Sequence, residues 1–184
     1  MSPRRRELLA SLGVSFEVDP PRADETPRPD ETPSDLTQRL ALEKAQEVAQ
    51  RHRSALILAA DTVVSLQGAI LGKPSDSTHA RSMLRQLSGQ THLVFTGFAL
   101  LDAKKKQFHI ESVETRVTFH PLSDEVIERY LETEESLDKA GAYGIQGFAG
   151  QFVKTIQGSY SNVVGLPLEA LRIALPKFGI QPRL

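Results

Sequence analysis

The spacing of apolar residues predicts a helix at the start of the chain and four more along it. Leu8, Leu9 and Leu12 recur at helical spacing, behind a Ser2-Pro3 pair that suits the N-cap and first position of a helix, and Gly13 ends the run. The other predicted helices cover residues 34–51 with Ser34 as cap, the stretch to Gly89 with Ser75 or Ser77 as cap, 124–133 with Ser123 as cap, and 167–178.

Strands are predicted where apolar residues are continuous or alternate. Ala55–Ala60 is continuously apolar, as in a strand covered on both faces, and β character resumes over Thr62–Leu66. The other predicted strands are Val14–Val18, 69–71, Thr91–Leu101 and Gln107–Phe119 joined as a hairpin, and 152–156. Strands that alternate with helices predict a single α/β domain over residues 1–184 with a mixed sheet.

The segment from Asp19 to Pro33 is rich in proline and acidic residues and is not expected to form regular structure. Within it, Asp24-Glu25-Thr26-Pro27 is echoed by Asp30-Glu31-Thr32-Pro33. A flexible surface loop would explain this composition. An irregular segment of this length within a compact domain is also typical of a functional loop.

Composition excludes several classes of protein. The 184 residues include 22 basic and 23 acidic side chains, so the chain lacks the positive excess of a general nucleic-acid binder. It has no cysteine, and hence no disulfide framework and no thiol nucleophile. The longest apolar run, Ala55–Ala60, is too short to cross a bilayer. We therefore expect a soluble cytoplasmic protein with neither a membrane nor a nucleic-acid polymer as partner.

The first helix has the reverse of the charges that a helix start prefers. Arg4, Arg5 and Arg6 occupy a turn where the free backbone N–H groups already carry partial positive charge. A phosphate group near Ser2 would compensate for this arrangement. A solvated basic terminus is the alternative interpretation.

Two charged residues follow predicted strands. Asp61 comes directly after the Ala55–Ala60 run, and ligands of open α/β sheets bind at the carboxyl ends of strands. An aspartate that bonds its own turn backbone is the alternative. Lys73 follows the predicted strand 69–71, and a solvated loop lysine is equally compatible with the sequence there.

A glycine-rich stretch, residues 138–150, contains Gln146 and could bring backbone N–H groups close to a ligand; a plain connecting loop would have the same composition. The common phosphate-loop, dinucleotide-binding and His-Glu-x-x-His signatures are absent from the sequence.

Eight short blocks, taken together and in order, resemble the Maf family of nucleoside triphosphate pyrophosphatases. They are Ser2-Pro3-Arg4-Arg5, Asp24-Glu25, Arg39-Leu40-Ala41 with Lys44-Ala45, Ala60-Asp61-Thr62-Val63-Val64, Gly72-Lys73-Pro74, Leu87-Ser88-Gly89-Gln90-Thr91-His92, the glycine-rich 138–147, and Gly158-Ser159-Tyr160. The Ala-Tyr-Gly-Ile-Gln form of the seventh block further resembles the branch that acts on dTTP and UTP rather than on 7-methyl-GTP.

The resemblance implies a Maf-like, inosine-triphosphatase-like fold with a mixed sheet in two lobes around a nucleotide cleft. It also implies a homodimer that hydrolyses pyrimidine nucleoside triphosphates to nucleoside monophosphate and pyrophosphate with a divalent cation, Mg²⁺ or Mn²⁺. By position, Asp61 matches the proton acceptor of the family, and Arg4, Thr62 and Gln146 match positions associated with substrate choice. The remaining matched positions are Glu25, which with Asp61 would serve the metal, and those expected to contact the triphosphate: Ser2, Arg5, Lys44 and Lys73.

One departure from the family pattern concerns the start of the chain. Family members usually carry a first strand and a Leu-Ala-Ser-x segment, whereas here Met1 directly precedes Ser2. We expect this difference to weaken catalysis more than binding. It also keeps open an alternative function, a nucleotide-binding regulator of septum formation and cell division with weak or no turnover, which an assay for pyrophosphate release would distinguish.

Overall fold

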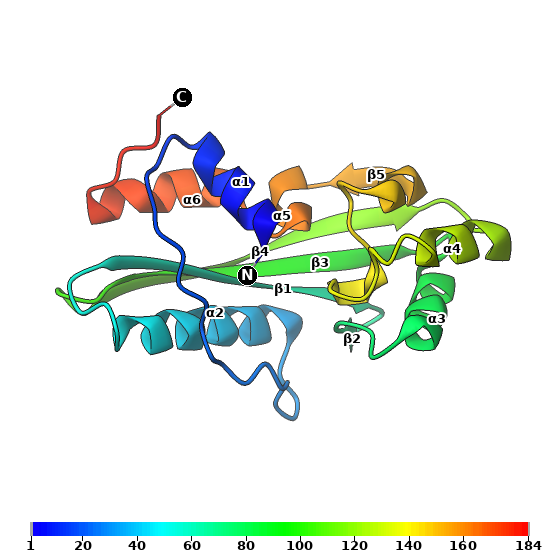
Figure 1. The fold of residues 1–184 in the computed structure, drawn as a ribbon, viewed down its shortest axis with the longest axis horizontal. Helices are drawn as coiled ribbons and strands as arrows, with labels where there is room; N and C mark the ends of the chain where they lie inside the picture. The colour runs from blue at the N-terminus through cyan, green and yellow to red at the C-terminus, as the bar shows by residue number, and fades with distance from the viewer. Residues whose placement is uncertain (1, 184) are drawn as a thin grey trace. The chain divides into compact units, whose positions relative to one another are not determined.

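The computed structural model describes residues 2–183, which form six α-helices, three short 3₁₀ helices and five β-strands (Figure 1). In chain order these are α1 (Pro3–Ser11), α2 (Pro33–Ala49), β1 (Leu56–Leu66), β2 (Ala69–Leu71), α3 (Ser77–Leu87), β3 (Thr91–Asp102), β4 (Gln107–Phe119), α4 (Asp124–Leu131), η1 (Ala140–Ala142), η2 (Phe148–Phe152), β5 (Val153–Gln157), α5 (Tyr160–Val164), α6 (Leu168–Ala174) and η3 (Leu175–Phe178). The expectation about the start of the chain concerns Met1 and what precedes it, which lie outside the described residues. No helix within residues 2–183 has the length and apolar composition of a membrane span.

The chain divides into two compact units. Unit 1 comprises the described residues up to Thr62, together with Thr96–Val113 and the described residues from Gly165 onward. Unit 2 comprises Val63–Phe95 and Glu114–Val164.

The strands pair in the order β2-β1-β3-β4-β5, and the pairing is antiparallel. Between β1 and β3, Ala103 N donates to Ala55 O and the hydroxyls of Thr62 and Thr96 lie 2.9 Å apart, so residue numbers rise on one strand as they fall on the other. The α/β class is confirmed, but the prediction of a mixed sheet is wrong. The β1–β2 hairpin reverses the chain before α3, and β3 therefore enters beside β1 in the opposite direction.

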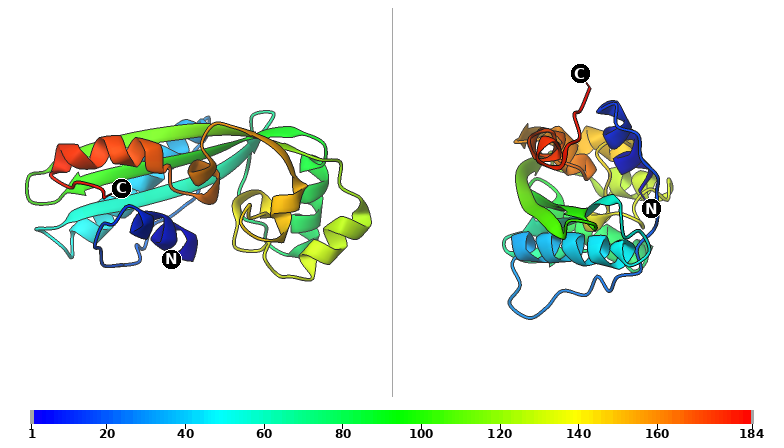
Figure 2. Two further views of the ribbon diagram at one scale, coloured as in Figure 1. Left: turned by 90° about the horizontal axis from the view of Figure 1, so that it is seen from above. Right: turned by 90° about the vertical axis from the view of Figure 1, so that its left-hand side faces the viewer.

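In unit 1, alternate residues of the strands feed two separate cores. One core packs against α1 and α6 and includes Leu56, Leu58, Ala60, Phe98 and Leu100; the other packs against α2 and includes Ala55, Ile57, Ala59, Ala99 and Leu101. Figures 1 and 2 show α2 on one face of these strands and α1 and α6 on the other. Coverage of both faces explains why this part of the sequence is continuously apolar.

Unit 2 has its own core, built on aromatic residues. Phe119, Tyr130, Tyr143 and Phe152 are buried there together with apolar residues of α3, and α3 packs against α4 and η1. The glycine-rich stretch is part of this unit: Gly141 has a φ of +66° and its N–H donates to Gly72 O at 3.1 Å. Glycine adopts a positive φ at little cost, and a Cβ atom at Gly141 would lie 3.0 Å from Val64 Cγ2, so this position favours glycine.

Several helices follow the predictions. Ser2 caps α1, Ser123 caps α4, and the β3–β4 hairpin has the expected bounds to within a residue. Two predicted caps are wrong: Thr32, not Ser34, caps α2, and Asp76, rather than Ser75 or Ser77, caps α3. In each case the observed cap side chain accepts a bond from the backbone N–H three residues on.

Two strand predictions are also wrong. Val14–Val18 has no regular structure, and its Phe16 and Val18 side chains remain 37% and 43% exposed, so the alternating pattern has no sheet to pack against. β1 is one strand from Leu56 to Leu66 and continues through Asp61, which therefore lies inside the strand and not at its carboxyl end.

Candidate active site

Asp61 and Thr62 face opposite sides of unit 1 because they are neighbours on one strand. The alternation that sends Ala59 to the α2 core and Ala60 to the α1/α6 core places Asp61 toward α2 and Thr62 toward α1. The hydrogen bonds agree, since Asp61 bonds to Lys44 of α2 and Thr62 to Arg5 of α1. One strand thus supports two polar clusters.

The first cluster joins Lys44, Asp61 and Glu25. Lys44 Nζ lies 2.6 Å from Asp61 Oδ1 and 2.6 Å from Glu25 Oε1, although Glu25 comes from the irregular segment before α2. Lys44 is 7% exposed, so its side chain belongs to the buried face of α2. Two carboxylates against one ammonium group leave this cluster net negative.

The second cluster is centred on the Arg5 guanidinium. Its Nη1 donates to Ala60 O at 2.8 Å, its Nη2 to Thr62 Oγ1 at 2.8 Å, and its Nε to Gly165 O at 2.7 Å. Burial lowers the pKa of Arg5. Arg5 thus uses two of its donors to join α1 to both residues that flank Asp61 and a third to bond Gly165, so fewer donors remain for the predicted phosphate contact.

The N-terminal end of α1 carries Ser2 and Arg4. Ser2 Oγ accepts a 3.4 Å bond from Arg5 N, and the first turn contains no acidic residue, as predicted. Arg4 is partly buried. This end of the helix therefore keeps the positive potential that the sequence indicated.

Lys73 and Gln146 belong to unit 2, and both are exposed. The Gly141–Gly72 hydrogen bond joins the turn before Lys73 to the glycine-rich stretch. Three residues before Gln146, the buried Tyr143 bonds through its hydroxyl to His92 Nε2 at 2.7 Å. The sequence did not predict this pair, because a single histidine has no spacing to other residues that would reveal its partner.

The Lys44 cluster contains two carboxylates, the type of ligand that magnesium and manganese prefer. Asp61 and Glu25 each place a carboxylate oxygen within hydrogen-bond distance of the same Lys44 Nζ, so the two carboxylates converge on one point. Magnesium takes oxygen ligands and is often bound by one or two carboxylates plus substrate phosphates. Within residues 2–183 no cluster of three or more acidic or histidine side chains could hold a metal alone. The residues present therefore fit a cation that is shared with a phosphate ligand.

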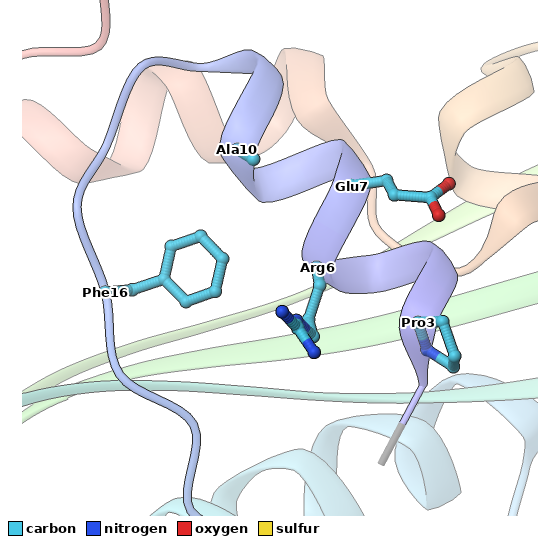
Figure 3. Close-up of a pocket in the computed structure, with 5 residues that line it drawn as sticks. All are labelled: Pro3, Arg6, Glu7, Ala10 and Phe16. Atoms are coloured by element: carbon cyan, nitrogen blue, oxygen red, sulfur yellow. The ribbon is translucent and has the colours of Figure 1, made fainter.

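A separate pocket of about 330 Å³ lies on another face of α1 (Figure 3). Its lining residues are Pro3, Arg6, Glu7, Ala10 and Phe16, and none of these is a predicted site residue. Figure 3 shows the Phe16 ring across from the α1 side chains. This pocket is distinct from the Arg5 and Lys44 clusters.

Comparison with known proteins places the sequence among one group. The family model described as Maf-like protein matches residues 1–178. A protein of Halalkalibacterium halodurans is 50% identical over 182 residues, which cover 99% of this chain and 95% of the relative. Proteins of Pelotomaculum thermopropionicum and Syntrophus aciditrophicus are 48% and 47% identical over 178 residues, covering 97% of this chain and 93% and 87% of the relatives. All three relatives are named dTTP/UTP pyrophosphatase.

Proposed function

Because this chain belongs to the Maf family, we propose that it hydrolyses dTTP and UTP to the nucleoside monophosphate and pyrophosphate. The structural observation that carries the proposal is the buried Asp61 carboxylate, held 2.6 Å from Lys44 Nζ. Asp61 is the one charged residue of β1, and general-base catalysis is a role that a buried carboxylate can serve.

In the proposed reaction, a water oxygen forms a bond to the α-phosphorus and the bond from that phosphorus to the α–β bridging oxygen breaks. Asp61 takes a proton from the attacking water, and the bridging oxygen leaves with pyrophosphate. Lys44 orients the Asp61 carboxylate and supplies positive charge beside the phosphate oxygens.

We propose Mg²⁺ or Mn²⁺ as the cofactor, held by Asp61 and Glu25. When bound, the cation would screen the negative charge of the phosphates. Lys44 offsets part of the negative charge of the same two carboxylates and holds both within 2.6 Å of its Nζ.

For substrate choice we propose Arg4, Thr62 and Gln146. The Gln146 amide offers both a donor and an acceptor, as does the edge of uracil or thymine. The Thr62 hydroxyl already bonds to Arg5 and Thr96, so Thr62 would act as part of that network. It stays a prediction that the triphosphate contacts Ser2, Arg5 and Lys73.

The test is Asp61→Asn, assayed by pyrophosphate release from dTTP and UTP. Loss of a general base costs roughly 10²- to 10⁴-fold in turnover, and the fold should persist because asparagine is nearly isosteric with aspartate. Asp124→Asn is a matched control, since it removes the same charge from an exposed ion pair with Arg85. Chromatography should show monophosphate and pyrophosphate as products.

Two results would contradict the proposal. Near wild-type turnover in Asp61→Asn would remove Asp61 from its role. Nucleotide binding without pyrophosphate release by the unaltered protein would favour the regulatory alternative.

A further inference from the structure

The irregular segment from Asp19 to Glu31, here called the strap, runs along α2 in the opposite direction to the helix (Figure 1). Every third residue of the strap contacts a polar residue of α2 or of the turn after it. These contacts are Asp19 with Arg51 and His52, Arg22 N with Glu47, Glu25 with Lys44, Arg28 with Glu43, and Glu31 with Arg39. As numbers rise along the strap, those of its partners fall.

The strap is rich in proline, with Pro20, Pro21, Pro27 and Pro29, but it does not form one regular helix. Asp30 has a φ of +58° and residues 29–30 form a turn, and Arg22 contacts Glu47 through its backbone N–H and not through its side chain. In the echoed Asp-Glu-Thr-Pro sequence, the glutamates Glu25 and Glu31 both reach α2.

Glu25 is the strap residue that belongs to the candidate active site, and packing does not hold it. Its side chain is 46% exposed, so its position depends on how the backbone around it is fixed. Asp24 Oδ1 accepts bonds from Thr26 N at 3.0 Å and Thr26 Oγ1 at 2.6 Å, which forms a turn centred on Glu25. Thr26 O in turn accepts a bond from Arg39 Nη2 at 3.2 Å.

Arg39 also makes the best-buried ion pair of the strap within the described residues, the one with Glu31. It donates to both oxygens of Glu31, at 2.6 and 2.7 Å, and to Glu43 at 3.0 Å. The Arg39 and Glu31 side chains are 14% and 8% exposed. A planar guanidinium that is held at both edges has one orientation, and here that orientation directs Nη2 to the peptide beside Glu25.

We propose that Arg39 is a positioning residue of the active site, which acts through Glu25. By fixing Thr26 O and Glu31, it sets where the Glu25 carboxylate meets Lys44 and Asp61. The proposal rests on the proposed function for the catalytic importance of Glu25, and adds a residue that does not itself touch the reacting groups.

A double-mutant cycle with Arg39→Lys and Glu25→Gln tests the proposal. Lysine keeps the positive charge but cannot donate the two parallel hydrogen bonds of the guanidinium. Arg39→Lys should therefore lower kcat for dTTP by roughly 10- to 100-fold, as expected for a misplaced catalytic group. In the Glu25→Gln background the same change should lower kcat less than about twofold, since the group it positions is already lost. Equal loss in both backgrounds would overturn the proposal.

Arg28→Lys is the matched control. Arg28 is an arginine of the strap itself, 64% exposed and bonded to Glu43 of α2, and the change should leave kcat within about twofold. A fall as large as that of Arg39→Lys would mean that any loosening of the strap has the same effect, and would overturn a specific role for Arg39.

Hydrogen exchange provides a readout that does not depend on turnover. Backbone amides of residues 22–31 should exchange faster in Arg39→Lys than in the unaltered protein and in Arg28→Lys, and equal rates would overturn the proposal. If Arg39→Lys fails to fold, Glu31→Gln removes the carboxylate charge that Arg39 binds, and we expect the same loss of kcat and the same faster exchange from it. If the unaltered protein releases no pyrophosphate, the proposed function fails, and exchange still decides whether Arg39 holds the strap at Glu25.

Discussion

His92 is a buried histidine that the fold keeps neutral. It is 1% exposed, its Nε2 bonds to the Tyr143 hydroxyl, and its Nδ1 has no hydrogen-bond partner among the described residues. The rings of Phe119 and Tyr143 meet it edge-on at 4.8 and 5.4 Å. Burial lowers the pKa of His92 from 6.5 to about 4 and raises the pKa of Tyr143. The charged imidazolium is therefore disfavoured in the folded state.

This difference predicts a pH dependence of stability. The unfolded chain binds a proton below about pH 6.5, whereas folded His92 does so only near pH 4. The contribution of neutral His92 to the free energy of unfolding is therefore complete above pH 6.5 and is lost as the pH falls. The loss reaches about 3 kcal/mol near pH 4, since each pKa unit corresponds to about 1.4 kcal/mol. The free energy of unfolding, measured with urea between pH 7 and 4.5, should fall in this way in the unaltered protein and not in His92→Gln. An identical slope in both would contradict the assignment.

The residues of the active site differ in how far the sequence could reveal them. Asp61 stands out locally because a carboxylate interrupts an apolar run. Lys44 and Glu25 do not, because their importance comes from contacts that only the folded chain creates, between Lys44 and Asp61, 17 positions apart, and between Lys44 and Glu25, 19 positions apart. The local sequence pattern therefore identifies Asp61, whereas Lys44 and Glu25 could be predicted only through the family resemblance.

At the scale of elements, α2 and β3 approach each other closely at Gly97. A Cβ atom at this position would lie 2.3 Å from both the carbonyl carbon and the oxygen of Thr37, which are backbone atoms of α2. Neither strand nor helix can move easily, since both belong to the core around Ala41, Ala45 and Ala99. Small residues at this interface let the helix lie close enough for Lys44 to reach Asp61.

Gly97→Ala should therefore destabilise the protein. An added methyl group in a filled core costs roughly 1–3 kcal/mol, and here backbone rather than a flexible side chain would have to move. Chemical unfolding measures the effect. Gly72→Ala is the control, since a Cβ there meets nothing within 4 Å, and it should change stability by less than about 0.5 kcal/mol. Equal stability of both variants would mean that α2 shifts without cost.

Elements with strong local signals were predictable, and those decided by pairing were not. The Ser2 and Ser123 caps and the β3–β4 hairpin follow from turn and capping chemistry within a few residues. The alternation of Val14–Val18 resembles that of a strand, yet a strand needs a neighbour, and the sequence does not show whether one is available. Sheet direction was missed for the same reason, because it depends on how β3 returns beside β1.

At the scale of the whole molecule, the two units have separate cores but share strands. β1, β3 and β4 each contribute residues to both units. On β1, Ala60 belongs to a core of unit 1 and Val64 to the core of unit 2; on β3, Phe98 and Val94 are divided in the same way. Loss of either core would therefore leave half of each long strand without its packing.

This sharing predicts one cooperative unfolding transition, and matched core variants test it. Leu171→Ala in unit 1 and Leu84→Ala in unit 2 each truncate a leucine that is 0% exposed. Each should cost about 2–5 kcal/mol and lower a single Tm by roughly 5–15 °C, with calorimetric and van't Hoff enthalpies equal in both variants. If the units unfolded independently, each variant would instead lower one of two transitions and leave the other in place. That result would contradict the coupling, because it would require the shared strands to remain ordered when half of their packing is lost.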